Sequence, residues 1–305
     1  MKTSFKILLA TDYSEAVMNA ERYAFQFAKN TGSFIKIIHV FAPPLSIPYQ
    51  QFDPYTVDYT PFEYEMEKLE DHALKILRLL KIDPEEIHYS CEVREGNVTL
   101  QVVEEAKESD IDFIITGTHG VRGFIDILLG NTAWGIIKKA DCPVLALPED
   151  ALFTSVKNIV FATNYRLGEI PVINYLVEIA KIFDAELTLV HISNFSVSKE
   201  FEVKLYEDFR SEVNTHISYE KLNIKLIHSD KIIEGLNDFC SRSNANWLVM
   251  SPEKRDIFEK VFEPSSSKTR KMSFHSKIPL LAIPDFYKLS NSSFWKKYEI
   301  QKVHA

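Results

Sequence analysis

The segment IDFIITGTHGVRGFIDILLGNT, residues 111 to 132, joins an apolar run to a helical pattern through a loop with four glycines. Ile111 to Ile115 is a short, mostly apolar run typical of a buried strand, and Thr132 to Lys139 has helical spacing. Glycine lets backbone N–H groups approach an anion closely, and a helix N-terminus adds unpaired donors and partial positive charge. The segment therefore predicts a phosphate-binding loop between a strand and a helix.

Gly117, Gly120 and Gly130 follow the spacing Gly-x2-Gly-x9-Gly, with Asn131 and Thr132 after the last glycine. This spacing differs from the dinucleotide-binding GxGxxG pattern. It is not a P-loop either, because no Gly-Lys-Ser or Gly-Lys-Thr follows. A glycine-rich loop alone is weak evidence for phosphate binding, so the remainder of the chain decides the interpretation.

Composition sets the class of protein. The 305 residues are 46% hydrophobic and carry a net charge of -8. The length predicts about two globular domains. The negative charge gives no indication of nucleic-acid or membrane binding, and we recognise no signal peptide and no apolar stretch long enough to span a membrane. Three widely separated cysteines predict neither a disulfide framework nor a metal site, so we expect a reducing, cytoplasmic setting.

Strands and helices alternate along the first half, which predicts an open, doubly wound α/β domain with a parallel sheet and right-handed crossovers. Between them, Ala42 to Pro61 holds five prolines and several aromatics, which predicts a long loop that is either a ligand lid or a plain surface segment. We expect strands at Phe5 to Ala10, Phe34 to Phe41, His88 to Val93, Ile111 to Thr116 and Val144 to Leu147, and helices at Ala16 to Lys29, Phe62 to Leu80, Leu100 to Lys107 and Thr132 to Lys139.

The chain then repeats itself. KILLATD at residues 6–12 returns as NIVFATN at 158–164, and His39-Val40 returns as His191-Ile192 at the same offset. Phe113 to Ile115 returns as Trp247 to Val249, and CPVLALP at 142–148 returns as IPLLAIP at 278–284. Four matching segments in one order predict two copies of a domain. We expect the first domain over 1–150, the second over 151–288 and a C-terminal tail over 289–305.

Together these features resemble the universal stress protein family. The early Ala-Thr-Asp, the Gly-Thr-His-Gly loop and the closing Cys-Pro-Val strand are similar to the family pattern, over residues Phe5 to about Asp285. The resemblance implies two tandem, open, doubly wound domains with five-stranded parallel sheets of the adenine nucleotide alpha hydrolase-like type, related by a pseudo-twofold axis. It also implies that the closing strands, Val144 to Leu147 and Leu280 to Ile283, pair within the chain.

The resemblance further implies an ATP site, with Mg²⁺, in the first domain. Asp12 would lie near the base and hold the phosphate-bound metal, while backbone from Ala10, Thr11 and Val40 would line the base pocket. The family usually has Ser or Thr directly after the third glycine, where this chain has an asparagine whose amide can still donate to phosphate. A Gly117→Val change would then remove binding and leave the fold intact. Residues that would wrap the ribose and phosphates are Gly117, Gly120, Gly130, Asn131 and Thr132.

The second half has lost the glycine loop. Gly117 aligns with Ser251 and Asp12 with Asn164, while Lys254 replaces Gly120 and residues 255–264 contain no glycine. Side chains would crowd a backbone that must lie close to phosphate, and the asparagine removes a charged metal ligand. We therefore expect nucleotide in the first domain only. Residues 265–268 could hold an anion at a helix start, but a plain N-cap is the simpler interpretation.

Three functions follow. The first is a stress-response protein that binds ATP in its N-terminal domain, with the degenerate C-terminal domain as intramolecular partner. The second is an interaction or scaffold protein that binds no nucleotide. The third, a slow ATP hydrolase, ranks last because no base or arginine finger is evident. Asp12, His39 and His119 form no recognisable triad, since no serine lies on a Gly-x-Ser-x-Gly elbow. A homodimer remains open.

Overall fold

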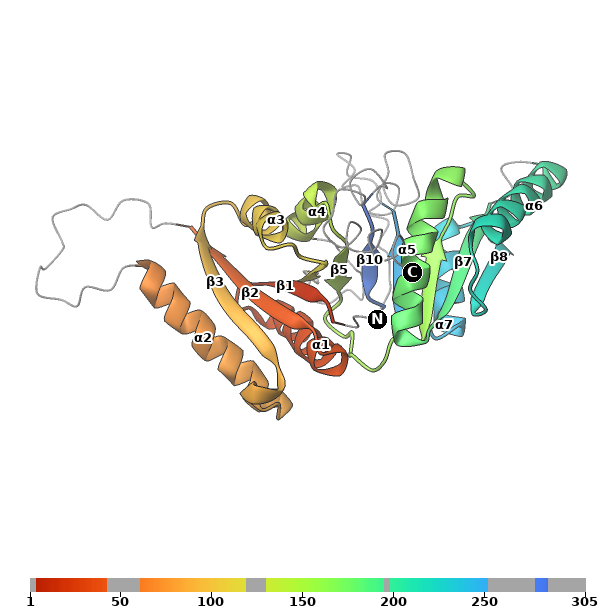
Figure 1. The fold of residues 1–305 in the computed structure, drawn as a ribbon. Helices are drawn as coiled ribbons and strands as arrows, with labels where there is room; N and C mark the ends of the chain where they lie inside the picture. The colour runs from red at the N-terminus through yellow and green to blue at the C-terminus, as the bar shows by residue number, and fades with distance from the viewer. Residues whose placement is uncertain (1–3, 43–60, 119–129, 195–197, 252–277, 285–305) are drawn as a thin grey trace, which may run out of the picture.

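The fold is a single twisted sheet covered by helices on both faces (Figure 1). The computed structural model describes residues 4–42, 61–118, 130–194, 198–251 and 278–284. Within them, ten strands follow the spatial order β3-β2-β1-β4-β5-β10-β9-β6-β7-β8. The lid suggested for Ala42 to Pro61 lies almost entirely outside the described residues, as do most of the glycine loop and the C-terminal tail.

The first half supplies five parallel strands, with β1 paired to both β2 and β4. Its elements are β1 (Lys6–Thr11), α1 (Glu15–Thr31), β2 (Phe34–Phe41), α2 (Pro61–Leu80), the short 3-10 helix η2 (Pro84–Glu86), β3 (His88–Glu95), α3 (Val98–Glu108), β4 (Phe113–Gly117), α4 (Asn131–Lys139) and β5 (Val144–Leu147).

The second half repeats this arrangement in mirrored order across the sheet, and its five strands are again parallel to one another. Its elements are β6 (Asn158–Ala162), the 3-10 helix η3 (Leu167–Glu169), α5 (Ile170–Phe183), β7 (Glu186–Ser193), α6 (Lys199–His216), β8 (Leu222–His228), α7 (Ile232–Arg242), β9 (Trp247–Met250) and β10 (Leu280–Ala282).

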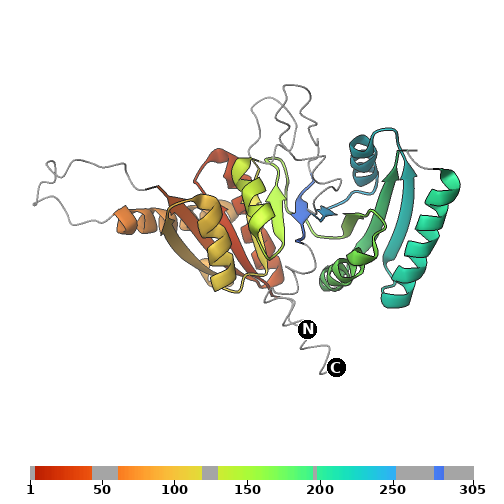
Figure 2. The same ribbon diagram turned by 90° about the horizontal axis from the view of Figure 1, so that it is seen from above.

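The halves join where β5 and β10 pair antiparallel, with Leu145 opposite Leu281 (Figure 2). Because this pair lies at the centre of the strand order, both strands are buried along their whole length. The sheet therefore runs unbroken from one half into the other.

Alternation of side chains along β1 divides the core into two layers. Ile7 and Leu9 lie in one cluster with the buried faces of α1, α2, α5 and α6. Leu8 and Ala10 lie in the other, with those of α3, α4 and α7. Burial on both faces explains why the strands read as nearly continuous apolar runs.

Local sequence signals place the helix ends. α1 ends at Gly32, whose left-handed φ of 63° suits a residue without Cβ, as the Thr31-Gly32 pair predicted. α3 begins earlier than expected, because the Asn97 side chain accepts a hydrogen bond from the Leu100 amide and caps the helix. In the described residues no helix is both long and apolar enough to cross a membrane.

Candidate functional site

The candidate site lies where β1 and β4 separate. The chain leaves β1 for α1 on one face of the sheet, while α4 covers the other face. In open α/β sheets, ligands bind at the carboxyl ends of strands at such a switch point. Only four residues separate the end of α4 from β5, so α4 runs antiparallel to that strand. Its N-terminus therefore lies at the carboxyl edge, as does Asp12 directly after β1.

Four predicted residues lie at or just beyond the ends of β1 and β2. Ala10 and Thr11 are buried at the end of β1, and Asp12 is exposed just beyond it. The Asp12 carboxylate accepts a 3.0 Å hydrogen bond from the Ser14 amide, which turns the chain into α1. Val40, near the end of β2, packs on the same core cluster that contains Ala10. Ala10 and Val40 therefore share the sheet face that α4 covers.

The helix start has the character expected of an anion site. Gly130 occupies the N-cap position, and its carbonyl accepts a 3.0 Å hydrogen bond from the Trp134 amide. As a glycine, the N-cap residue has no side chain with which to cap the first turn. Asn131 is exposed and Thr132 half-buried. The first-turn amides and two polar side chains thus present donors at the carboxyl edge. Gly120 lies outside the described residues.

Gly117 has a different place from the one expected. It is the last residue of β4, paired with Leu147 and buried, rather than part of the loop. A Cβ added there would lie 3.3 Å from both the Ala16 carbonyl oxygen and the Val17 Cα. Its missing side chain lets α1 approach the sheet, so we correct the expectation that Gly117→Val leaves the fold intact. A contribution of its backbone to ligand binding stays a prediction.

A polar network behind Asp12 fixes the end of β1. His39 Nδ1 donates to the Thr11 carbonyl at 2.9 Å, and the Thr11 hydroxyl donates to the buried carboxylate of Glu21. The Tyr13 amide donates to Thr11 Oγ1 at 3.1 Å. Tyr13 has a φ of 62° and stacks on His39 with ring centroids 4.3 Å apart. Burial, and secondarily the charge of Glu65, raises the pKa of the Tyr13 hydroxyl above its ordinary value.

Sequence reasoning missed the roles of Tyr13 and His39, although the repeat contained the signal. In the second half, Tyr165 has a φ of 59°, and His191 Nδ1 donates to the Thr163 carbonyl at 2.8 Å. The Thr-x-Tyr plus His set therefore builds the same turn twice. Because it persists in the half without the glycine loop, its first role is structural.

The remaining second-half counterparts differ as the sequence predicted. Asn164 stands where Asp12 lies, and Ser251 follows β9 where Gly117 ends β4. The Ser251 hydroxyl is buried without a hydrogen-bond partner among the described residues. Lys254 and residues 255–268 lie outside those residues.

Metal ligation by protein side chains alone finds no support in the described part of the chain, where no group of three or more His, Cys, Asp or Glu residues is placed to hold an ion. Mg²⁺ does not need such a group, because it is commonly held by one or two carboxylates together with phosphate oxygens and water. The exposed Asp12 carboxylate, at the same sheet edge as the first turn of α4, fits that arrangement.

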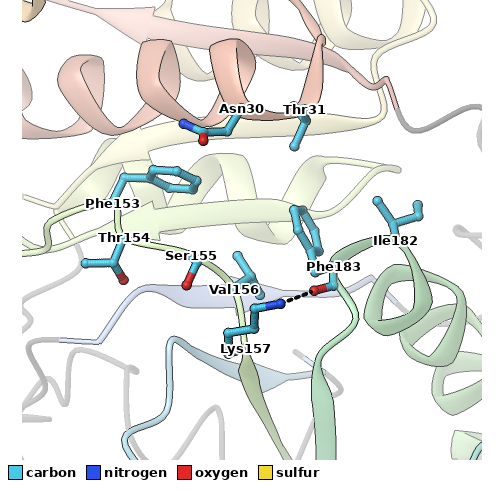
Figure 3. A pocket seen from close by; sticks show the side chains of 9 residues that line it. All are labelled: Asn30, Thr31, Phe153, Thr154, Ser155, Val156, Lys157, Ile182 and Phe183. Carbon is cyan, nitrogen blue, oxygen red and sulfur yellow. Dashed lines mark hydrogen bonds between the residues drawn. The ribbon is translucent and has the colours of Figure 1, made fainter.

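A separate crevice of about 290 Å³ lies between the C-terminal ends of α1 and α5 (Figure 3). The connecting segment 153–157 forms one wall, and Lys157 Nζ donates to the Phe183 carbonyl at 3.1 Å. α1 begins beside Asp12 and ends at this crevice, so the two features lie at opposite ends of the helix.

Comparison with known proteins gives consistent matches. A family model described as the universal stress protein family matches residues 4–148. Universal stress protein MJ0531 of Methanocaldococcus jannaschii is 30% identical over 146 residues, covering 47% of this chain and 81% of the relative. Universal stress protein A homolog 1 of Coxiella burnetii is 30% identical over 143 residues, covering 46% and 94%. A solved universal stress protein from Archaeoglobus fulgidus shares the fold across both halves, with a TM-score of 0.63, 18% identity and coverage of 93% and 97%.

Proposed function

This chain belongs to the universal stress protein family, and from that premise we propose that its N-terminal half binds ATP with Mg²⁺. The observation that carries the proposal is the N-terminus of α4, which begins at a glycine N-cap without a side chain and shares the carboxyl edge of the sheet with the exposed Asp12. Helix amides and glycine backbone would hold the phosphates, as at other helix-start anion sites.

Each predicted residue has a part in this proposal. Ala10, Thr11 and Val40 would contact the base through strand backbone. Gly120, Gly130, Asn131 and Thr132, with the backbone of Gly117, would surround the ribose and phosphates. Asp12 would hold Mg²⁺, which neutralises phosphate charge when it is bound. The second half would serve as a built-in partner, and its continuous sheet with the first half through β5 and β10 supports that role.

Titration calorimetry with Mg-ATP tests the proposal directly. We expect saturable binding by the wild type and at least a tenfold weaker affinity for Gly120→Ala, since a methyl group would stand between backbone and phosphate. Lys254→Ala, at the aligned position of the second half, is the matched control and should bind like the wild type. Absence of binding by the wild type would favour the scaffold alternative, and phosphate release at saturating ATP would support the hydrolase.

The metal role of Asp12 has its own test. Asp12→Asn keeps the size of the side chain and an oxygen that can accept from the Ser14 amide, but it removes the charge. We expect this variant to lose affinity for ATP about tenfold when Mg²⁺ is present and much less when EDTA is present. Equal losses under both conditions would contradict a metal-binding role. The reverse change in the second half, Asn164→Asp, should leave both affinities unaltered.

A further inference from the structure

Two neighbouring helices begin at the candidate nucleotide edge of the sheet. α3 follows β3 after only Gly96 and Asn97, so its first turn lies at the same carboxyl edge as the first turn of α4. The two helices are in contact on one face of the sheet, and both contribute buried residues to the same core cluster (Figure 1). The place of the α4 N-terminus at this edge is therefore set in part by what separates α4 from α3.

α4 approaches α3 closely at a glycine in its second turn. Gly135 and Thr99, which lies in the first turn of α3, are both half-buried. A Cβ added to Gly135 would lie 2.9 Å from Thr99 Oγ1, 3.0 Å from Thr99 Cγ2 and 3.5 Å from Thr99 Cβ. Because non-bonded carbon atoms are normally about 3.5–4.0 Å apart, the space between the helices is too small for a methyl group.

Thr99 cannot make this space by turning its side chain. Its hydroxyl and its methyl group lie about equally close to the position of the added Cβ. Either of the other staggered rotamers would bring one hydrogen toward Gly135 but would leave one heavy atom there. A side chain at position 135 therefore has to move one helix away from the other.

Glycine is otherwise a poor choice for this position. After proline it is the least favourable residue in the interior of a helix, and Gly135 is the fifth of the nine residues of α4. Helix formation alone therefore gives no reason for a glycine here, whereas the close contact with Thr99 does.

We propose that Gly135 and Thr99 position the phosphate-binding start of α4, an inference that rests on the proposed ATP site. Gly135 lies four residues after Asn131, which is about 6 Å along the helix axis. A helix this short moves as one body, so a side chain at position 135 also displaces the amides of the first turn. Hydrogen bonds from these amides to phosphate weaken when their length and angle change. Both residues act through the helix, without touching the ligand.

Calorimetry with Mg-ATP on two single variants and their double variant tests the proposal. We expect Gly135→Ala to bind about tenfold more weakly than the wild type, which corresponds to the loss of roughly one hydrogen bond to a charged group. Thr99→Ala removes both close atoms and leaves its own Cβ 3.5 Å from the new methyl carbon, an ordinary contact. Gly135→Ala/Thr99→Ala should therefore bind within about twofold of Thr99→Ala alone. Recovery requires a folded site, so it excludes misfolding as the cause of the loss, and its absence would overturn the proposal.

A second ligand separates displacement of the helix start from general damage to the pocket. Adenosine has the base and ribose of ATP but no phosphate. We expect Gly135→Ala to bind adenosine as the wild type does, while its affinity for Mg-ATP falls. Equal losses for the two ligands would overturn the role given to the first turn of α4.

Gly235→Ala is the matched control in the second half. Gly235 is a glycine inside α7, where an added Cβ would lie 2.6 Å from Ser229 Cβ. This variant should bind Mg-ATP like the wild type, and a loss as large as that of Gly135→Ala would overturn the proposal. Wild-type affinity in Gly135→Ala would overturn the positioning and leave the ATP site intact. Absence of Mg-ATP binding by the wild type would overturn the proposed function, and the positioning with it.

Discussion

At the scale of single residues, Glu105 shows how a buried carboxylate can be made stable. It is 1% exposed on α3, with Lys36 Nζ at 2.5 Å and the Arg94 guanidinium in direct contact. Burial acts to raise the pKa of this carboxyl, but hydrogen bonds from Lys36 and Ser109, with the charges of Lys36 and Arg94, outweigh it and leave the pKa below its ordinary value. The folded state therefore favours the charged form.

This network predicts a pH-dependent loss in Glu105→Gln. At pH 7 we expect the free energy of unfolding, measured with urea, to fall by about 2 kcal/mol, because two half-buried cations lose their most buried counter-charge. Because the pKa of Glu105 is lower in the folded state, its ionisation stabilises the fold above about pH 4.3, the ordinary pKa of an unfolded glutamate. This contribution disappears as the pH falls through the pKa of the folded state. The difference between variant and wild type should therefore shrink below about pH 4. Glu108→Gln is the control, since this half-exposed partner of Arg94 should contribute less than about 1 kcal/mol.

Gly117 gives a second prediction at this scale. The two nearest neighbours of its missing Cβ are backbone atoms of α1, which cannot turn aside as a flexible side chain can. We expect Gly117→Val to lower the free energy of unfolding by about 2 kcal/mol, and Gly117→Ala by less. Thermal unfolding without nucleotide measures both. A Gly117→Val protein as stable as the wild type would restore the idea that this glycine serves the ligand alone.

At the scale of elements, hydrophobic pattern placed the strands and helices of the first half within a few residues. Burial on both faces makes the central strands visible as apolar runs, and Gly32 marks a helix end by its backbone conformation. The site was harder to predict. Glu21 and His72 look like ordinary polar positions of amphipathic helices, and only packing of α1 on α2 brings them together. Gly117 follows a Thr and precedes a loop, so its strand pairing has no local signature.

The start of α3 illustrates a boundary that one side chain decides. Asn97 Oδ1 accepts from the Leu100 amide at 3.1 Å, so the helix begins at Val98, two residues before the start at Leu100 that the sequence predicted. Asn97→Ala should lower the free energy of unfolding by about 1 kcal/mol, because the cap is lost. Asn97→Asp should keep most of the stability of the wild type, because aspartate can also cap the helix. Urea denaturation followed by far-ultraviolet circular dichroism makes the comparison. Similar losses for both variants would show that the cap contributes little.

At the scale of the whole molecule, the two halves share buried aromatic packing as well as a strand pair. Trp247 of β9 is fully buried, with ring centroids 6.1 Å from Phe27 and 5.6 Å from Phe183. Its indole N–H donates to the Tyr23 hydroxyl of α1 at 2.7 Å, across 224 residues of sequence. The repeat predicted two domains, but it could not predict this contact, because Trp247 has an N–H to donate and Phe113, the equivalent residue of the first half, has none.

The Tyr23–Trp247 hydrogen bond predicts that the halves unfold as one unit. Tyr23→Phe leaves a buried indole N–H without its partner, which should lower the free energy of unfolding by about 1–3 kcal/mol. In the cycle with Trp247→Phe, a coupling energy of about 1 kcal/mol would assign part of this loss to the bond between the halves. Urea titrations of all four proteins should each give one transition, because β5 and β10 still join the sheet. Two transitions in the wild type would show that the interface is too weak to make the halves cooperative.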